Sequence, residues 1–224
     1  MIDATRTLIS PLFTARYRLA RSRPDIRPLN VPFAAASGSE PDRVLVVGTG
    51  PAVGWGLTTH DIALPGQLAK SLASATGRGA HVAAFSDPDE RLTTLPRLIE
   101  EHVLYNWDVI VVTLEAAEPM TFRSPASFAE ALKQTVSAVI ARSHPATRVM
   151  VTSALLADAP RHIGPRTSRL ITGHAPVLDE TARNICSGLP RTIHLTLPDQ
   201  DCDDFTSPTS VNHASRSRLV VGPR

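Results

Sequence analysis

The chain has 224 residues, 42% of them hydrophobic and 20% charged, which is typical of a globular domain with an apolar core. The formal net charge of +2 and the aromatic content of 4% argue against an extended nucleic-acid-binding surface, so no nucleic acid is expected as a partner. The two cysteines, Cys186 and Cys202, lack a CxxC spacing, which excludes a cysteine-based zinc site and most disulfide scaffolds.

Residues 1–24 predict a basic amphipathic helix. Ser10 and Pro11 are typical of a helix start, and the arginines that follow are interleaved with a short apolar stripe made by Leu12, Phe13, Tyr17 and Leu19. Because the stripe is short, a helix docked on the domain is favoured over peripheral contact with a membrane. The N-terminus lacks a signal-peptide pattern and no run of about 18 apolar residues occurs, so a cytoplasmic protein without a membrane span is expected. Residues 25–42, rich in proline and serine, are expected to form a linker.

From residue 43 onward, apolar runs alternate with helical patterns. The runs are rich in valine, isoleucine, leucine and alanine, as a sheet buried on both faces requires, and they predict strands at residues 43–48, 81–85, 108–114, 148–153 and 192–197. Helices are predicted at about residues 64–76, 93–105, 126–143 and 174–187. Strand–helix alternation with right-handed crossovers gives a parallel sheet between two layers of helices, so the predicted class is α/β.

The first predicted strand runs into a glycine turn, VLVVGTGPAVGWG at residues 44–56, which suggests a dinucleotide-binding loop. The context argues against that interpretation. Gly54, Gly56 and Pro65 oppose a helix directly after the turn, the spacing is GxGxxxG, and no acidic residue follows at about 20 residues. No GK[ST] follows either, so a phosphate-binding P-loop is also disfavoured.

A long loop followed by a helix fits another α/β family. The stretch VLVVGTGPAVGWGLTTHDIALPGQLAKSL resembles the first block of the SGNH/GDSL hydrolases, esterases and lipases in which a GDS motif precedes small residues and glycines. The resemblance spans residues 43–215 and leaves a short tail over residues 216–224. It implies a three-layer α/β/α sandwich around a parallel five-stranded sheet with flavodoxin-like topology. It also implies a serine nucleophile, a histidine base preceded by an aspartate, and oxyanion donors that include an asparagine, without a cofactor.

The blocks that carry the nucleophile and the oxyanion donor are degenerate in this sequence. The GDS motif corresponds to Gly48-Thr49-Gly50, so Gly50, which has no nucleophilic atom, stands at the serine position. The family's GxND block corresponds to EAAE at residues 115–118, so Ala117 replaces the asparagine and cannot donate a side-chain hydrogen bond. Thr49 occupies the aspartate position, where the side chain is expected to point into the structure.

The remaining pocket residues are acidic or vestigial. The family's DxxH block is SVNH here, so Ser210 replaces the aspartate and His213 is left without its partner. Asp87, Glu115 and Glu118 are expected at the same edge of the sheet, where carboxylates repel a developing oxyanion. Facing His213, they would suit a divalent cation, but a solvated acidic rim is favoured and no metal site is assigned.

These substitutions predict a pseudohydrolase, a hydrolase-like protein that has lost ester hydrolysis and acts as a binding or regulatory module. The expected partner is a small ligand that bears an acyl or glycan group. The alternative is an active esterase or acyltransferase whose catalytic residues have been relocated within the same fold.

Overall fold

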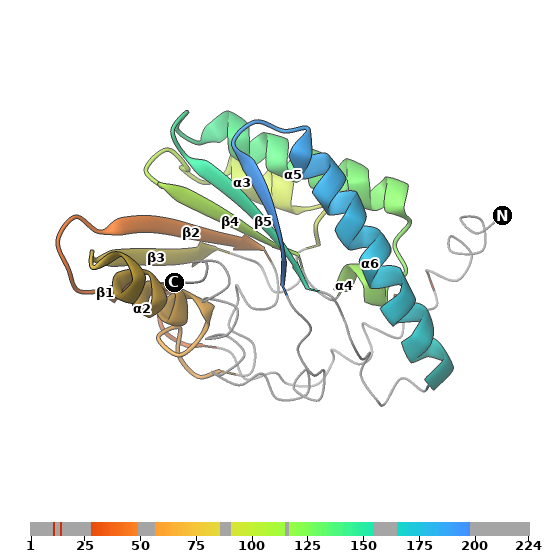
Figure 1. The fold of residues 1–224 in the computed structure, drawn as a ribbon, viewed down its shortest axis with the longest axis horizontal. Coiled ribbons are helices and arrows are strands. Elements are labelled where there is room, and N and C mark those ends of the chain that lie inside the picture. Colours follow the sequence, from red (N-terminus) through yellow and green to blue (C-terminus); the bar gives the residue numbers. More distant parts are fainter. Residues whose placement is uncertain are drawn as a thin grey trace.

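The protein is described by a computed structural model that covers residues 28–48, 57–85, 91–114, 117–154 and 165–197, together with Pro11 and Thr14. A six-stranded sheet with strand order β1-β3-β2-β4-β5-β6 forms its centre (Figure 1). Strands β2 to β6 are parallel, and β1 pairs antiparallel with β3 at the edge. The strands are β1 (Phe33–Ala36), β2 (Asp42–Gly48), β3 (Ala80–Phe85), β4 (Val109–Leu114), β5 (Arg148–Ala154) and β6 (Thr192–Leu197).

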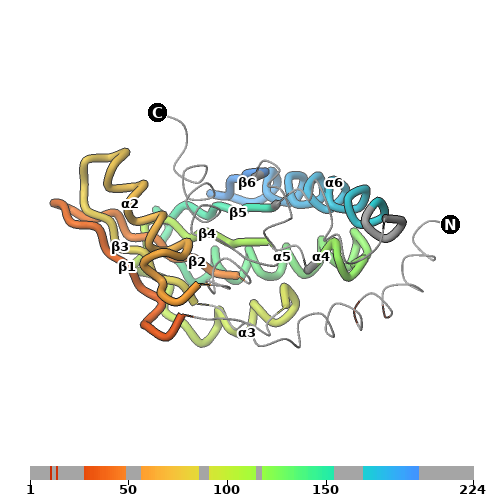
Figure 2. The backbone as a smooth tube through the Cα atoms, turned by 90° about the horizontal axis from the view of Figure 1, so that it is seen from below, coloured from red at the N-terminus to blue at the C-terminus, as the bar shows by residue number. Residues whose placement is uncertain are grey.

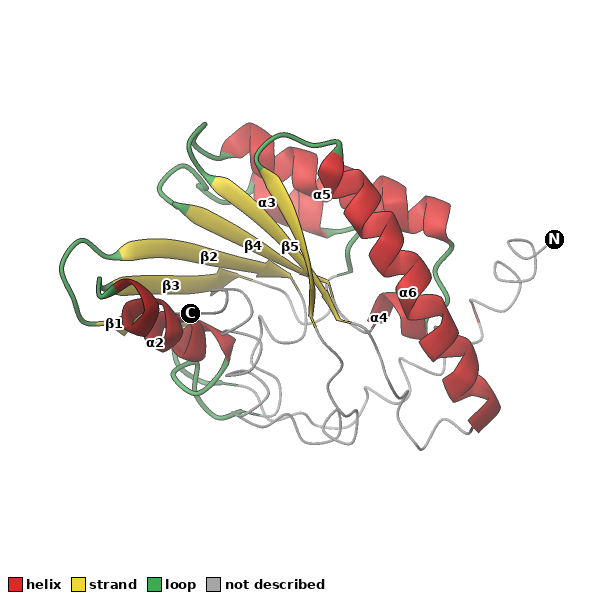
Figure 3. Cartoon of the chain, viewed as in Figure 1, coloured by secondary structure: helices red, strands yellow, loops and turns green. Residues whose placement is uncertain are grey.

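The helices that connect these strands are α2 (Leu64–Thr76), α3 (Leu95–Glu100), α4 (Ala117–Met120), α5 (Pro125–Arg142) and α6 (Pro165–Ser187). Local sequence explains where α5 begins: the Ser124 hydroxyl accepts a hydrogen bond from the Ser127 amide, and Pro125 occupies the first turn. No helix among the described ranges is long and apolar enough to cross a membrane. Figure 3 distinguishes the helices from the strands of the sheet by colour.

Alternating side chains of the central strands divide the core into two layers. Val44 and Val46 of β2 pack with Leu68 of α2 on one face of the sheet. Leu45 and Val47 face the opposite way, into a larger cluster that contains side chains of α3, α5 and α6. Helices therefore cover both faces, as the three-layer α/β/α prediction requires. Figure 2 shows α6 beside β6, and α2 near β1 and β3.

The parallel strands confirm the predicted fold class, and their order β3-β2-β4-β5-β6 is the flavodoxin-like order. The sheet has a sixth strand that was not predicted: β1 lies within residues 25–42, the stretch expected to be a linker. Its four residues pair with β3 from Phe33↔Ala83 to Ala36↔Ala80, so part of this stretch belongs to the sheet.

Two helical predictions also need correction, and one short helix was not predicted. Helix α3 is shorter than the predicted 93–105, because the chain turns after Glu101 and Leu104 forms a β-bridge with Ser143. Helix α6 begins at Pro165 rather than at residue 174, with Pro176 inside it, where a proline removes one backbone hydrogen bond. The four-residue helix α4 was not predicted.

Candidate functional site at the carboxyl end of the sheet

Strands β2 and β4 approach each other closely at their carboxyl ends. Gly48, the last residue of β2, pairs with Thr113 and has a φ of +151°. A Cβ atom on Gly48 would lie 2.1 Å from Thr113 Oγ1 and 2.5 Å from the Thr113 carbonyl oxygen, so only glycine fits this position. The chain's connections leave β2 and β4 in opposite directions, and at such a switch point α/β proteins bind ligands.

The segment after β4 contains two predicted pocket residues, Ala117 and Glu118. Ala117 begins helix α4, and the next residue, Glu118, is buried with a side chain 11% exposed. Its Oε2 accepts a hydrogen bond of 2.9 Å from Nη1 of Arg123, a residue that is itself mostly buried. The expectation that Glu118 adds an uncompensated negative charge to the site therefore needs correction, because Arg123 neutralises it at close range.

A strained turn joins this ion pair to helix α6. Phe122 is buried and has a φ of +53°, an uncommon conformation for a bulky residue. Its ring stacks on the imidazole of His174 with ring centroids 5.2 Å apart. Nε2 of His174 donates a hydrogen bond of 2.7 Å to the carbonyl oxygen of Arg123. No sequence pattern pointed to His174, since a single histidine on a helix has no spacing typical of a ligand set.

The other predicted pocket residues cannot be placed. Thr49, Gly50, Asp87, Glu115, Ser210 and His213 lie outside the described residues. Of the predicted pocket, the structure places Gly48 at the end of β2, and Ala117 and Glu118 in the helix that follows β4. In the described part of the chain, no three histidine, cysteine, aspartate or glutamate side chains are grouped so that they could hold a metal ion.

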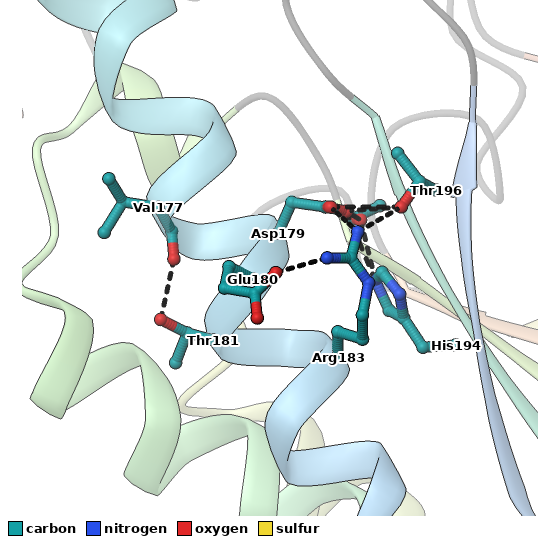
Figure 4. A network of polar contacts seen from close by, with 8 residues as sticks. Val177, Asp179, Glu180, Thr181, Arg183, His194 and Thr196 are labelled. Carbon is teal, nitrogen blue, oxygen red and sulfur yellow. Dashed lines mark hydrogen bonds and ion pairs between the residues drawn. The ribbon is translucent and has the colours of Figure 1, made fainter.

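A second polar cluster, also missed from the sequence, lies one residue before the ends of β5 and β6. Ser153 of β5 and Thr196 of β6 are register partners, and both donate hydrogen bonds to the carboxylate of Asp179 on α6. Arg183, one turn further along α6, donates to Asp179 Oδ2 at 2.8 Å. His194 of β6 completes the cluster, which Figure 4 shows between the helix and the strand.

Serine, histidine and aspartate together suggest a catalytic triad, but the geometry argues against one. In a triad, serine and aspartate contact different imidazole nitrogens. Here Ser153 Oγ and Asp179 Oδ1 face the same atom, Nε2 of His194, at 3.0 and 3.4 Å. Ser153 gives its only proton to the carboxylate, so Nε2 must carry a hydrogen and cannot accept one. The cluster therefore holds its elements together and does not activate the serine.

Comparisons with known proteins identify the fold. No protein-family model and no curated protein matches the sequence. Among solved structures, the inhibitor-bound aryl esterase of M. smegmatis has a TM-score of 0.57 and 19% identity, covering 80% of this chain and 96% of the esterase. A carbohydrate acetylesterase family member from Sinorhizobium meliloti has a TM-score of 0.56 and 16% identity, covering 80% and 95% of the two chains.

A third similar structure is a family two carbohydrate esterase from Clostridium thermocellum in complex with cellohexaose, with a TM-score of 0.54 and 14% identity. It is matched over 83% of this chain and 64% of the esterase. At such low identities the likeness concerns the backbone arrangement. The chain has the SGNH hydrolase fold that the sequence resemblance implied.

Proposed function

We propose that this chain is a member of the SGNH hydrolase family that has lost ester hydrolysis and acts as a binding or regulatory module. The observation that carries this proposal is the pair of substitutions at the two chemically essential motif positions. Gly50 offers no nucleophile two residues after the end of β2, and Ala117 offers no side-chain donor at the start of α4. Loss of one oxyanion donor alone typically lowers kcat by about 100-fold to 1,000-fold.

The described residues also argue against a substitute nucleophile in the polar cluster. Ser153 is buried, and its proton is held by Asp179 while His194 Nε2 serves as a donor. An ester would need access to the serine oxygen and a free base beside it. This cluster provides neither, which favours a silent protein over relocated chemistry at this position.

The proposed ligand is a small molecule that bears an acyl or glycan group. The similar structures include an aryl esterase and carbohydrate esterases, one of them in complex with cellohexaose. The place proposed for this ligand is the switch point between β2 and β4, because α/β proteins bind ligands at the carboxyl ends of strands where the connections diverge. We also propose a cytoplasmic location, which the buried free thiol of Cys186 suits and cell fractionation would test.

Hydrolysis of 4-nitrophenyl acetate and 4-nitrophenyl butyrate by the purified chain tests the loss of activity. We expect turnover at the background rate, and an unchanged result for Gly50→Ser alone, because the groups of a catalytic unit act non-additively. Turnover that disappears in Thr49→Ala, Ser153→Ala or His213→Ala would instead identify an active esterase with relocated residues.

Calorimetric titration with cellohexaose and with phenyl acetate tests binding separately from catalysis. Gly50→Trp should obstruct the carboxyl end of the sheet and abolish the binding signal. Gly188→Trp is a matched control, because Gly188 lies in the exposed turn between α6 and β6 at the opposite end of the sheet. Equal binding by both variants, or no binding of either probe by the native chain, would contradict the proposed module at this edge.

A further inference from the structure

A row of exposed apolar side chains lies along the β1 edge of the sheet. Leu29, Val31 and Phe33, at alternate positions of the chain, are 99%, 74% and 42% exposed. They are three of the eight large apolar residues that are exposed in the described part of the chain. Because monomeric proteins rarely expose several large apolar side chains side by side, this row indicates an interaction surface.

The backbone of β1 offers hydrogen-bonding groups on its outer side. The Pro32 carbonyl oxygen accepts a hydrogen bond of 2.8 Å from the Ala84 amide of β3. Since antiparallel ladder bonds alternate, every second residue from Pro32 onward faces β3, and Phe33 and Ala35 direct their backbone groups outward. The missing N–H of Pro32 therefore falls on the inner side and does not block the edge. The Phe33 N–H donates to the Val31 carbonyl oxygen at 2.7 Å, whereas the Phe33 carbonyl and the Ala35 backbone groups face away from β3.

We propose that this edge pairs antiparallel with the β1 edge of a second copy of the chain, so that one sheet runs through both subunits. In this two-fold pairing Phe33 lies opposite Ala35 of the second copy, and the Ala35 N–H donates to the Phe33 carbonyl oxygen across the interface in both directions. Neither bond needs the Phe33 N–H, which Val31 already engages. The pairing also sets a large side chain against a small one and brings the two Phe33 rings within diagonal reach.

The charge distribution favours a second copy over a charged partner. The sequence has no charged residue from Pro28 to Ser39, so two identical edges meet without repulsion between like charges. Sheet edges that stay unpaired are typically protected by lysine or another charged side chain, and β1 has none. A partner of either charge would find no opposite charge on this segment. A two-fold contact needs only one surface that is complementary to itself, and it is the commonest arrangement of homo-oligomers.

The β1 edge lies away from the candidate ligand site. Strands β3 and β2 separate β1 from β4, and Figure 1 shows β1 at the margin of the sheet, on the side opposite β6. The pairing therefore does not depend on the proposed function, and it stands whether or not the carboxyl end of the sheet binds a ligand.

Sedimentation velocity of the full chain at about 1–100 µM tests the pairing, because this range covers a micromolar dissociation constant. We expect a dimer with about twice the 24.0 kDa mass of one chain. Phe33→Lys should raise the dissociation constant at least about tenfold, because it removes both rings and places two ammonium groups close together. Ile193→Lys is the matched control: Ile193 is 49% exposed on β6, the opposite edge strand, and its replacement should leave the dimer intact. Ala35→Pro removes the outward N–H and should also abolish the dimer.

A native chain that stays monomeric over this range would overturn the proposal, and a dimer that appears only after deletion of residues 1–24 would assign the row to that segment. A dimer that survives Phe33→Lys and Ala35→Pro, or that Ile193→Lys weakens equally, would also overturn it. If neither β1 variant folds by circular dichroism, hydrogen exchange of the native chain provides the second test. Protection of the Ala35 amide must then rise with protein concentration, and protection independent of concentration would refute the pairing.

Discussion

Replacement of Gly48 by alanine tests how closely β2 and β4 are held at the switch point. The new Cβ would lie 2.1 Å from Thr113 Oγ1, which can rotate away, and 2.5 Å from the Thr113 carbonyl oxygen, which cannot without breaking the sheet. The φ of +151° adds backbone strain of about 1–3 kcal/mol, and overpacking typically costs about 1–3 kcal/mol more. We expect Gly48→Ala to lower the free energy of unfolding by about 3–5 kcal/mol, a large share of the total of a typical domain.

Urea denaturation of Gly48→Ala and Gly77→Ala provides the measurement and its control. Gly77 also has a positive φ, +71°, but no atom lies within 4 Å of the position of its Cβ. Gly77→Ala should therefore lower the free energy of unfolding only by the cost of the left-handed conformation, about 1–2 kcal/mol. If the two variants lose equal stability, steric contact with β4 is not what requires glycine at position 48, and the argument for a tightly closed switch point fails.

Arg191 donates to the carbonyl oxygens of Ile140 in the last turn of α5 and of His144 and Thr147 between α5 and β5. Arg191→Ala should therefore lower the free energy of unfolding by about 2 kcal/mol in urea denaturation. Arg191→Lys, which cannot reproduce the fork of donors, should recover less than half of that loss, and full recovery would contradict this account. Burial lowers the pKa of both His60 and His194. The free energy of unfolding should therefore be highest above about pH 6.5 and should decline as the pH falls toward the lowered pKa values. Denaturant titrations that give a higher free energy of unfolding at pH 5.5 than at pH 7.5 would refute this. Deletion of residues 1–24 should lower the melting temperature, since each side chain of the predicted helix that is buried contributes about 1.5–3 kcal/mol. Leu29, which follows this segment in the sequence, is 99% exposed in the described chain. Unchanged melting together with lost binding to anionic vesicles would instead identify the segment as a membrane contact.

The sequence predicted the central sheet well because burial leaves a plain pattern. Strands β2 to β5 contribute apolar side chains to the core on both faces of the sheet, and helix α2 has observed bounds that coincide with the predicted residues 64–76. Strand β1 was missed because it has only four residues, three of them alanine, in a segment punctuated by proline. Its strand character comes from pairing with β3, about 47 residues further along the chain, and no local pattern encodes that partner.

The candidate site was predictable only where it coincides with a motif. The sequence could single out Gly48, Ala117 and Glu118 because they end or follow predicted strands, whereas the cluster of Ser153, Asp179 and His194 comes from three separate elements. Asp179 and His194 are 26 and 41 residues from Ser153 along the chain, and they meet because α6 packs against the paired strands β5 and β6. The available signal was a set of polar residues inside otherwise apolar strands, since a buried polar side chain requires a partner.

Because Glu118 is paired with Arg123, repulsion of an oxyanion by Glu118 is no longer a reason to expect that ester hydrolysis is absent. The sequence suggested that acidic side chains repel the oxyanion, but a carboxylate with a guanidinium 2.9 Å away contributes little net charge to its surroundings. The expected loss of hydrolysis therefore follows from the missing catalytic groups, because Gly50 has no nucleophilic oxygen and Ala117 has no side-chain hydrogen-bond donor. The framework is retained beneath them, since the contact of Gly48 with Thr113 belongs to the sheet and needs no catalytic residue. In such a fold the chemistry can be lost through loop positions while the sheet that carries them is unchanged.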